Sequence, residues 1–321
     1  MSVGCHTLNL RNNALTIGGL MNGHLNTPLP QLHVGHGSHH GALSIFPVWV
    51  DAPRLTGLDW KAASIRNAER EGSPVVGELV LHNSSSRPVV ALEGDLLKGG
   101  WQDRMLAASI LLEPFEARVV EALCVEHGRW GERSSEGHGS RGTHEAHGRR
   151  SALSVRHGNL RGTDQQGEVW RRIGRYETSL GATASSSMLD HLDRSQPITT
   201  RQLEGQRGVI IGIGGRVMGA EIFGSSTGLR ARWQGILTAA ALDARLAPER
   251  RTTAHDARVF ARYLQAVTLE DGGDAGLARA VRSHQGRLRT SGIVQANASA
   301  APPSIIHLTA FDDAHPLLEN A

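Results

Sequence analysis

The chain has 321 residues, 39% of them hydrophobic, which is enough apolar material for a packed core and excludes global disorder. Its net charge is +3, and all but two of the 34 basic residues are arginines, interspersed with 31 acids, so we expect no basic stripe for nucleic acid. Aromatic residues make up 4%, too few for a base-stacking platform.

The sequence also argues against a membrane span, a disulfide framework and a cysteine-based zinc site. No apolar run approaches the roughly 18 residues of a membrane span. The first residues, MSVGCHTLNL, do not have the pattern of a signal peptide. Two cysteines, Cys5 and Cys124, cannot form a disulfide framework or a cysteine-based zinc site. We therefore expect a cytoplasmic protein without a membrane anchor.

Three regions follow one another along the chain. Residues 1–41 are rich in His and Gly and are predicted to be a flexible segment. Residues 42–247 are predicted to form an α+β domain with a mobile loop at 131–164, where Ser, Gly, His and Arg replace apolar residues. Residues 248–321 are predicted to form helices and a short strand that pack on the same domain.

Within the central region, apolar alternation predicts an antiparallel meander. The turns between its strands contain Pro, Asn and Ser, which are typical of tight connections. We expect strands at 43–50, 75–82, 89–92, 104–112 and 117–125, and helices at 59–70, 165–176 and 185–192.

The stretch GVIIGIGGRVMGAEIF, residues 208–223, is the most informative for the fold. Its Gly212-x-Gly214 resembles a dinucleotide-binding fingerprint, but that fingerprint needs a helix directly after the glycines. A second strand-like run follows instead, so we expect a β-hairpin that turns at Gly214 and Gly215.

The remaining elements are helical except for the last. Helices are expected from Ser225 or Ser226, at 255–267 and at 275–284, and a final strand at 304–311. The whole pattern predicts an α+β fold with a mainly antiparallel sheet, sandwich-like or a partial barrel, with packed helices.

Polar residues gather in EGDLLKGGWQDR, residues 93–104, between two apolar strands. Glycines there allow a close backbone approach, and Arg104 is a planar donor that suits phosphate or carboxylate. Gln102 and Asp103 suit hydroxyl groups or a base. The same residues also fit a turn held by an ion pair of Glu93 or Asp103 with Arg104, and the sequence leaves both interpretations open.

A second polar run, CVEHGRW at residues 124–130, ends a strand. Period-two alternation places Glu126 on the face of Cys124, at the rim of an apolar surface. A carboxylate in that place suits general acid–base catalysis, but a Glu126–Arg129 ion pair under Trp130 also fits. Cys124 is expected to be a small buried apolar residue and not a nucleophile.

Histidines cluster at 24–40 and 127–157, and His144 and His147 have a metal-like spacing. Their segment lacks the helix of an HExxH site, so we expect no metal site and no cofactor. Arg216 and Glu221 lie on the glycine-rich hairpin, where a ligand or a packed helix could approach.

Taken together, the motifs resemble those of the ADP-ribosylglycohydrolase and rhodanese-phosphatase-associated protein domain family. The resemblance covers roughly residues 42–246 and rests on IFP at 45–47, EGDLLKGGWQDR at 93–104, CVEHGRW at 124–130, QGEVW at 166–170 and the hairpin at 208–223. It implies a place in pathways that use NAD and ADP-ribose. The polar residues that match the family's motifs are Glu93, Gly94, Gln102, Arg104, Glu126, Gly128, Arg129 and Trp130.

The chain departs from the family's usual pattern at two positions. Asp103 stands where Asn is common, and His127 stands where Gln is common. The negative charge of Asp103 beside Arg104 argues against direct phosphate binding at that arginine.

The two polar runs flank one hairpin, which brings residues 102–104 next to residues 126–130 at the same end of the sheet. The predicted site for a small nucleotide-type ligand contains Glu93, Gly94, Gln102, Asp103, Arg104, His127, Arg129 and Trp130. Three functions remain open. The chain binds or senses a ligand related to ADP-ribose or NAD, or it is an enzyme on such a ligand with Glu126 as acid or base, or it is a structural or protein-partner module with a buried ion-pair network.

Overall fold

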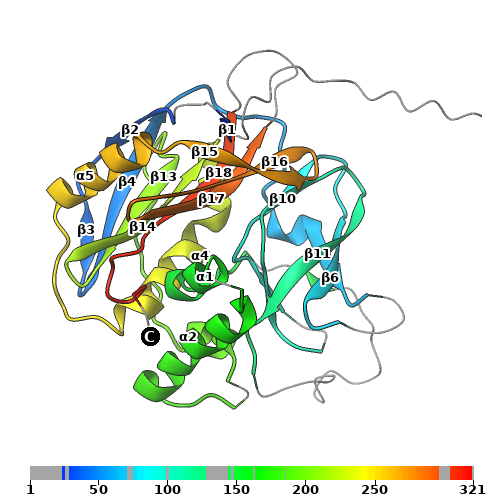
Figure 1. The fold of residues 1–321 in the computed structure, drawn as a ribbon, viewed down its shortest axis with the longest axis horizontal. Coiled ribbons are helices and arrows are strands. Elements are labelled where there is room, and N and C mark those ends of the chain that lie inside the picture. The colour runs from blue at the N-terminus through cyan, green and yellow to red at the C-terminus, as the bar shows by residue number, and fades with distance from the viewer. Residues whose placement is uncertain are drawn as a thin grey trace, which may run out of the picture.

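A computed structural model describes residues 24–25, 29–70, 75–98, 101–127, 144–145, 148–161, 163–184, 186–295 and 304–319. Figure 1 shows a large curled sheet with helices packed against it and a smaller β-structure beside it. Strands make up 38% of the described residues, and the sheets are mostly antiparallel. The prediction of an α+β fold with a mainly antiparallel sheet is confirmed, and the large sheet curls into a half-barrel.

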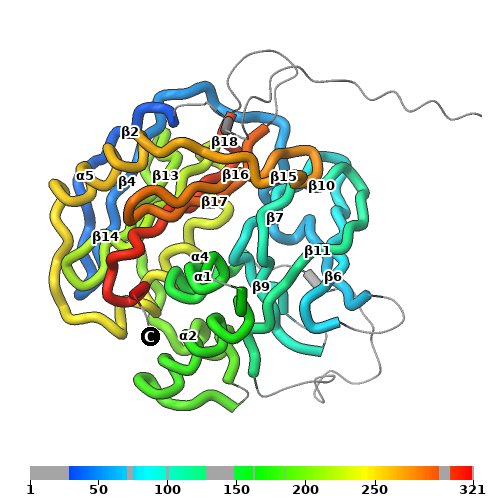
Figure 2. Tube along the Cα trace, in the orientation of Figure 1, coloured from blue at the N-terminus to red at the C-terminus, as the bar shows by residue number. Residues whose placement is uncertain are grey.

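The large sheet is built from β1 (His24–Leu25), β2 (Gln31–Val34), β3 (Ser38–His40), β4 (Leu43–Asp51), β13 (Gly208–Ile213), β14 (Arg216–Phe223), β15 (Leu269–Ala275), β16 (Ala278–Gln285), β17 (Leu288–Gln295) and β18 (Ser304–Asp312). In the described part of the chain its order is β1-β15-β16-β17-β18-β14-β13-β4-β2, with β3 also paired to β4. The strands after residue 248 and those before it therefore share one sheet, with the blue N-terminal and orange-red C-terminal strands on either side of β13 and β14 (Figure 2).

The central hairpin of β13 and β14 confirms the prediction for residues 208–223. Gly214 and Gly215 turn the chain with φ of 62° and 90°, the left-handed region that a two-residue type I′ turn requires. Every residue of β13 is buried, since helices cover both faces of the sheet at this point.

The helices are α1 (Leu153–Asn159), α2 (Gln165–Leu180), α3 (Met188–Asp193), α4 (Ser226–Ala244) and α5 (Ala254–Gln265). Helix α4 covers one face of the large sheet, where Ile211 packs in the same cluster as Trp233. Helix α5 covers the other face, where Ile210 packs with Phe260. The predicted start of α4 is confirmed, because the Ser225 hydroxyl accepts a hydrogen bond from a backbone N–H in the first turn of the helix.

The smaller β-structure consists of β5 (Ile65–Ala68), β6 (Glu78–Asn83), β8 (Leu96–Leu97), β9 (Arg104–Leu106), β11 (Ala117–Cys124) and β12 (His144–Glu145), together with the separate pair β7 (Val89–Ala91) and β10 (Ile110–Leu112). Its inner face has a core of its own, and the N–H of Leu277 donates to the Leu111 carbonyl at 2.9 Å to join it to the large sheet. Helices α1, α2 and α3 pack on the other face, where Met105 and Val125 meet Ile173.

Two predicted helices are wrong. At 59–70 the chain makes one 3-10 turn and then enters β5, in which Ile65 and Asn67 are buried with a period of two. At 275–284 the chain forms β16, which is hydrogen-bonded on both sides by β15 and β17. In both places the pairing with strands elsewhere in the sequence outweighs local spacing that also fits a helix.

Two predicted flexible segments are in part regular structure. Within the predicted loop 131–164, Leu153–Asn159 form α1, in which every residue is buried. Within the predicted flexible segment 1–41, β2 and β3 pair with β4. The other parts of these segments lie largely outside the described residues. None of the described helices has the length and apolarity that a bilayer crossing requires.

Candidate functional site

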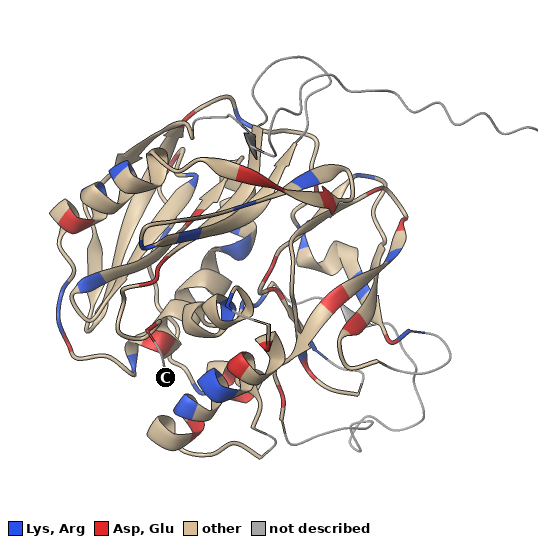
Figure 3. Ribbon diagram, viewed as in Figure 1, with Lys and Arg blue, Asp and Glu red and all other residues tan. Residues whose placement is uncertain are grey.

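The polar residues of the two motifs fall into two buried groups, whereas the sequence predicts one. The arginine cluster consists of Glu93, Asp95, Arg150, Arg156, Glu221, Arg232 and His307. The Arg104 site lies where β9 begins and β11 ends, and it consists of Glu69, Gln102, Asp103, Arg104 and Glu126. Basic and acidic residues are interspersed over the whole ribbon (Figure 3), so burial is what distinguishes these two groups.

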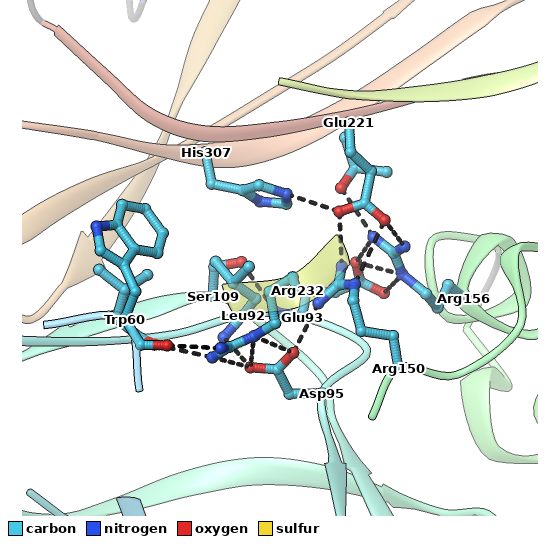
Figure 4. Close-up of polar contacts among 12 residues, drawn as sticks. Trp60, Leu92, Glu93, Asp95, Ser109, Arg150, Arg156, Glu221, Arg232 and His307 are labelled. Carbon is cyan, nitrogen blue, oxygen red and sulfur yellow. Dashed lines mark hydrogen bonds and ion pairs between the residues drawn. The ribbon is translucent and has the colours of Figure 1, made fainter. Parts of the chain in front are cut away.

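In the arginine cluster, Asp95 binds two arginines that come from different elements (Figure 4). Its Oδ1 accepts from Nη1 of Arg150 at 2.7 Å, and its Oδ2 accepts from Nη2 of Arg232 at 2.9 Å. Arg232 belongs to α4 and also donates to the Trp60 carbonyl at 2.7 Å. Asp95 Oδ2 accepts in addition from the N–H of Leu92 at 3.0 Å, so the turn before β8 is tied to α4.

Glu221, on β14, completes the connection to the large sheet. Its Oε1 accepts from Nη1 of Arg156 at 2.6 Å, and its Oε2 lies 3.0 Å from Nε2 of His307 on β18. Nη2 of Arg150 lies 3.1 Å from the same Oε2. Arg150 therefore bridges Asp95 and Glu221, and through them the smaller β-structure and the large sheet (Figure 4).

Glu93 binds Arg156 within the arginine cluster, and Gly94 lies directly against the Arg156 side chain. Nη2 of Arg156 donates to Oε2 of Glu93 at 2.9 Å and to the Thr309 hydroxyl at 2.8 Å. Gly94 has φ of 78°, and a Cβ at this position would lie 2.5 Å from Cδ of Arg156. This chain requires glycine here because the Arg156 side chain lies directly against the backbone.

The charges of the arginine cluster balance. Burial by itself raises the pKa of Glu221, but the charges of Arg150 and Arg156 outweigh burial and hold that pKa well below its usual range. Burial raises the pKa of Asp95 as well, and Arg232 and Arg150 likewise bring it below normal. Burial lowers the pKa of His307, which is neutral at pH 7. Three guanidinium groups thus face three carboxylates, a network of balanced charge that connects the two sheets.

The Arg104 site forms where the sequence predicts that the two polar runs meet. β9 and β11 pair with Arg104 opposite Cys124. The N–H of Asp103 donates to Oε2 of Glu126 at 2.9 Å, and Nε2 of Gln102 donates to the Glu126 carbonyl at 3.1 Å. Both the Gln102 and Glu126 side chains are buried.

Arg104 pairs with neither Glu93 nor Asp103, as a turn held by an internal ion pair would require. Its Nη1 donates to the carboxylate of Glu69, with Nη1 2.9 Å from Oε2, and Glu69 follows β5. The guanidinium group is completely buried, yet among the described residues its Nε and Nη2 have no hydrogen-bond partner, and neither does Oε1 of Gln102. Buried polar atoms of native proteins usually have partners, so these three atoms are the feature of the Arg104 site that its described contacts leave unexplained.

Cys124 and the motif residue Gln166 shape the floor of the Arg104 site. The Gln166 carboxamide accepts from the Cys124 N–H and donates to its carbonyl, both at 2.9 Å, and so acts as a strand partner for β11. The Cys124 thiol donates to the Glu126 carbonyl, and burial raises the pKa of the thiol. Cys124 is therefore protonated and packed, as expected from the sequence.

The rest of the predicted site is less closely connected. His127 contacts Trp170 edge-to-face at 4.7 Å between ring centroids. Arg129 and Trp130 lie outside the described residues, as do Gly128 and His147. Arg216 is exposed at the start of β14, away from Glu221 in the arginine cluster. Within the described ranges no group of three or more His, Cys, Asp or Glu could hold a metal ion.

The comparison with known families covers both groups of residues. The ARPP-1 domain, the ARG and Rhodanese-Phosphatase-superfamily-associated Protein domain, matches residues 31–311. The chain belongs to the ARPP-1 family. The match extends from β2 to β18 and so includes the entire large sheet apart from β1. Among curated proteins and among solved structures no match is found.

Several ionisable residues of the two groups in this ARPP-1 chain are missed by the sequence analysis, and all of them are buried except Glu69, which is half-buried. They are Glu69, Asp95, Arg150, Arg156, Arg232 and His307. A signal for some of them is present, since Arg156 stands inside LSVRHG and Arg232 inside the apolar stripe of α4. A charge in an apolar run predicts a buried partner, although it does not say which residue that partner is.

Proposed function

We propose that this ARPP-1 chain binds a nucleotide-derived anion of the ADP-ribose or NAD class at the Arg104 site, as a binding or sensing module. The observation that carries the proposal is the buried Arg104 guanidinium, whose Nε and Nη2 have no hydrogen-bond partner in the described part of the chain. Nε–H and Nη2–H point in parallel from one edge of the group, a geometry that suits two oxygens of a phosphate.

The second group of buried arginines does not compete for such a ligand. Arg150, Arg156 and Arg232 are matched by three carboxylates at 2.6–2.9 Å, which leaves no net positive charge for a phosphate. At the Arg104 site, Glu69 contacts only Nη1 and holds the guanidinium in place, so the donors of the opposite edge keep no partner among the described residues.

Asp103 is less unfavourable for phosphate than its place in the sequence suggests. Asp103 directly precedes β9, and the Asp103 and Arg104 side chains contact different parts of the fold. Asp103 Oδ2 lies 3.3 Å from the hydroxyl of Ser187, on the side of α3. Gln102 Oε1 is an acceptor for a ribose hydroxyl or a base amine next to the phosphate. The resemblance of the sequence motifs to the ADP-ribosylglycohydrolase-associated family implies the same ligand class.

The test compares ligand binding by the wild-type chain with binding by Arg104→Lys. Lysine keeps a positive charge beside Glu69 but lacks the paired donors. Hydrogen bonds to charged groups contribute about 1.5–3 kcal/mol, so we expect ADP-ribose to bind at least about tenfold more weakly. Titration calorimetry with ADP-ribose, NAD, AMP and inorganic phosphate measures the affinities, and thermal melting confirms that the variant folds.

Arg70→Gln is the matched control, because Arg70 forms an exposed ion pair with Glu78 close to the same strands. It should leave affinity unchanged. The proposal is refuted if none of the nucleotides binds the wild-type chain, or if Arg104→Lys binds ADP-ribose as tightly as the wild type. Equal affinity for phosphate and ADP-ribose would show an oxyanion site without nucleotide recognition.

A second candidate function is catalysis on the same ligand, favoured by the buried Glu126 carboxylate one strand away from Arg104. Glu126 would serve as the general acid or base, and Arg104 would stabilise developing negative charge. Product formation from ADP-ribose or NAD that is lost in Glu126→Gln, with binding retained, would select this function over binding alone.

A further inference from the structure

One end of the large sheet presents an open strand edge. β2 is the last strand of the described sheet and pairs only with β4. The N–H of Gly35 donates to the Pro47 carbonyl at 3.0 Å, so Gly35 and Pro47 form a hydrogen-bonded pair. From there, pairs with and without mutual hydrogen bonds alternate along β2 and β4. The Arg207 N–H reaches the Val48 carbonyl from the other side of β4. The backbone groups of Val34, opposite Val48, therefore point outward, as do those of Leu32.

A basic groove runs along this edge. It has a volume of about 500 Å³ and is lined by the four residues of β2 and by Arg258, Ala261, Arg262 and Gln265 of α5. Arg258 and Arg262 are exposed, and neither forms an ion pair with another described residue. No acidic residue is among the described residues that line the groove. Basic residues recur along α5 in Figure 3.

We propose that this groove binds an extended acidic segment of a partner protein, which adds to the sheet as a strand beside β2. The outward N–H and C=O groups of Leu32 and Val34 would supply the backbone hydrogen bonds. Arg258 and Arg262 are one helical turn apart, about 6 Å along the axis. Residues on one face of a strand repeat every 6.6–6.8 Å or so, which means that acids at alternate positions match the two arginines.

Neither the N-terminal segment nor the acidic strand of the described sheet is suited to fill the groove. Residues 1–50 contain no Asp or Glu, so the N-terminal segment lacks the complementary charge. β15, the acidic strand near the other end of the large sheet, has two of its three acidic side chains paired within the fold. Asp271 is paired with Arg279, and Asp274 is paired with Arg118 at 3.1 Å. A separate acidic partner therefore fits the groove better than a second copy of this chain.

The test uses a fluorescein-labelled peptide of eight alternating threonine and glutamate residues, with binding followed by fluorescence anisotropy. We expect saturable binding that is at least tenfold weaker for Arg258→Glu/Arg262→Glu. The control variant Arg230→Glu/Arg250→Glu changes the net charge equally at exposed positions outside the groove and should bind as the wild type does. A peptide with lysine in place of glutamate should not bind.

Strand addition is tested separately from charge. Methylation of alternate backbone amides of the peptide keeps its charges but removes its strand donors, and should abolish binding to the unaltered protein. Val34→Pro should weaken binding too, because it removes an outward N–H and no bond to β4. The proposal is overturned if the acidic peptide does not bind, if the groove variant binds like the control variant, or if the methylated peptide binds as well as the parent. Self-association of the wild-type chain that is lost in Arg258→Glu/Arg262→Glu, without binding of the acidic peptide, would assign the groove to a second copy.

Discussion

Replacing Asp95 with asparagine removes one negative charge from the arginine cluster without changing the size of the side chain. Asp95 accepts from Arg150 at 2.7 Å, from Arg232 at 2.9 Å and from the Leu92 N–H at 3.0 Å. The asparagine would offer a single acceptor oxygen to two buried guanidinium groups and would leave one positive charge without compensation. Removing one partner of a buried ion pair costs about 3–5 kcal/mol.

A neighbouring ion pair provides the control for the loss of a charge alone. Arg149, next to Arg150, pairs with Asp193, whose side chain is 56% exposed. Exposed pairs contribute about 0–1 kcal/mol, so Asp193→Asn should change the free energy of unfolding little. Urea unfolding followed by far-UV circular dichroism at pH 7 measures both variants, and the midpoint gives the loss if the slope is unchanged.

A compensating substitution separates charge balance from packing. In Asp95→Asn/Arg232→Met the cluster again has equal numbers of arginines and carboxylates. The double variant should therefore be more stable than the sum of the two single losses predicts. If Asp95→Asn is no more destabilising than Asp193→Asn, or if the two changes at Asp95 and Arg232 add without coupling, the arginine cluster does not hold the sheets together as argued.

Three further predictions concern single contacts. Nε2 of His315 donates to the Ile213 carbonyl, while its Nδ1 accepts from the Leu317 N–H, and burial lowers the pKa of His315 to about 4. In the unfolded chain this histidine gains its proton near pH 6.5. The free energy of unfolding should therefore decline as the pH falls from about 6.5 to 4. Urea unfolding across that range should show a smaller decline for His315→Gln, and an equal decline would contradict the assignment. Gly94→Ala should lower the free energy of unfolding by more than the approximately 1 kcal/mol expected from its positive φ, because the new Cβ meets Arg156. Gly57 has φ of 84° in open space, so Gly57→Ala should lose only the backbone contribution. Thermal melting of the two alanine variants checks this, and equal melting temperatures would show that Arg156 moves aside freely. Gln166→Leu should lose about 1–3 kcal/mol by leaving the Cys124 N–H and carbonyl without partners, and unchanged urea stability would refute that role.

Local sequence determined the features that depend on neighbouring residues. The Gly214-Gly215 turn needs two left-handed residues in succession, and only glycine adopts that conformation without strain, so the hairpin could be predicted. The Ser225 cap is equally local. Residues 102–104 meet Glu126 because β9 pairs with β11 close by in sequence, although β10 between them pairs with β7. The antiparallel α+β class follows from the same short-range patterns.

Only the tertiary structure decided which charges are buried together. Arg150 pairs with Asp95 across 55 residues of sequence, and Arg156 pairs with Glu221 across 65. Both arginines stand in a segment whose composition indicates a loop, and Arg232 gives no sign that Asp95, 137 residues away, is its partner. Burial of a charge is stable only where its partner is also placed, and that placement is a property of the packed sheets and helices. The motif at residues 93–104 is continuous in sequence, yet the fold sends its first half into the arginine cluster and its second half into the Arg104 site.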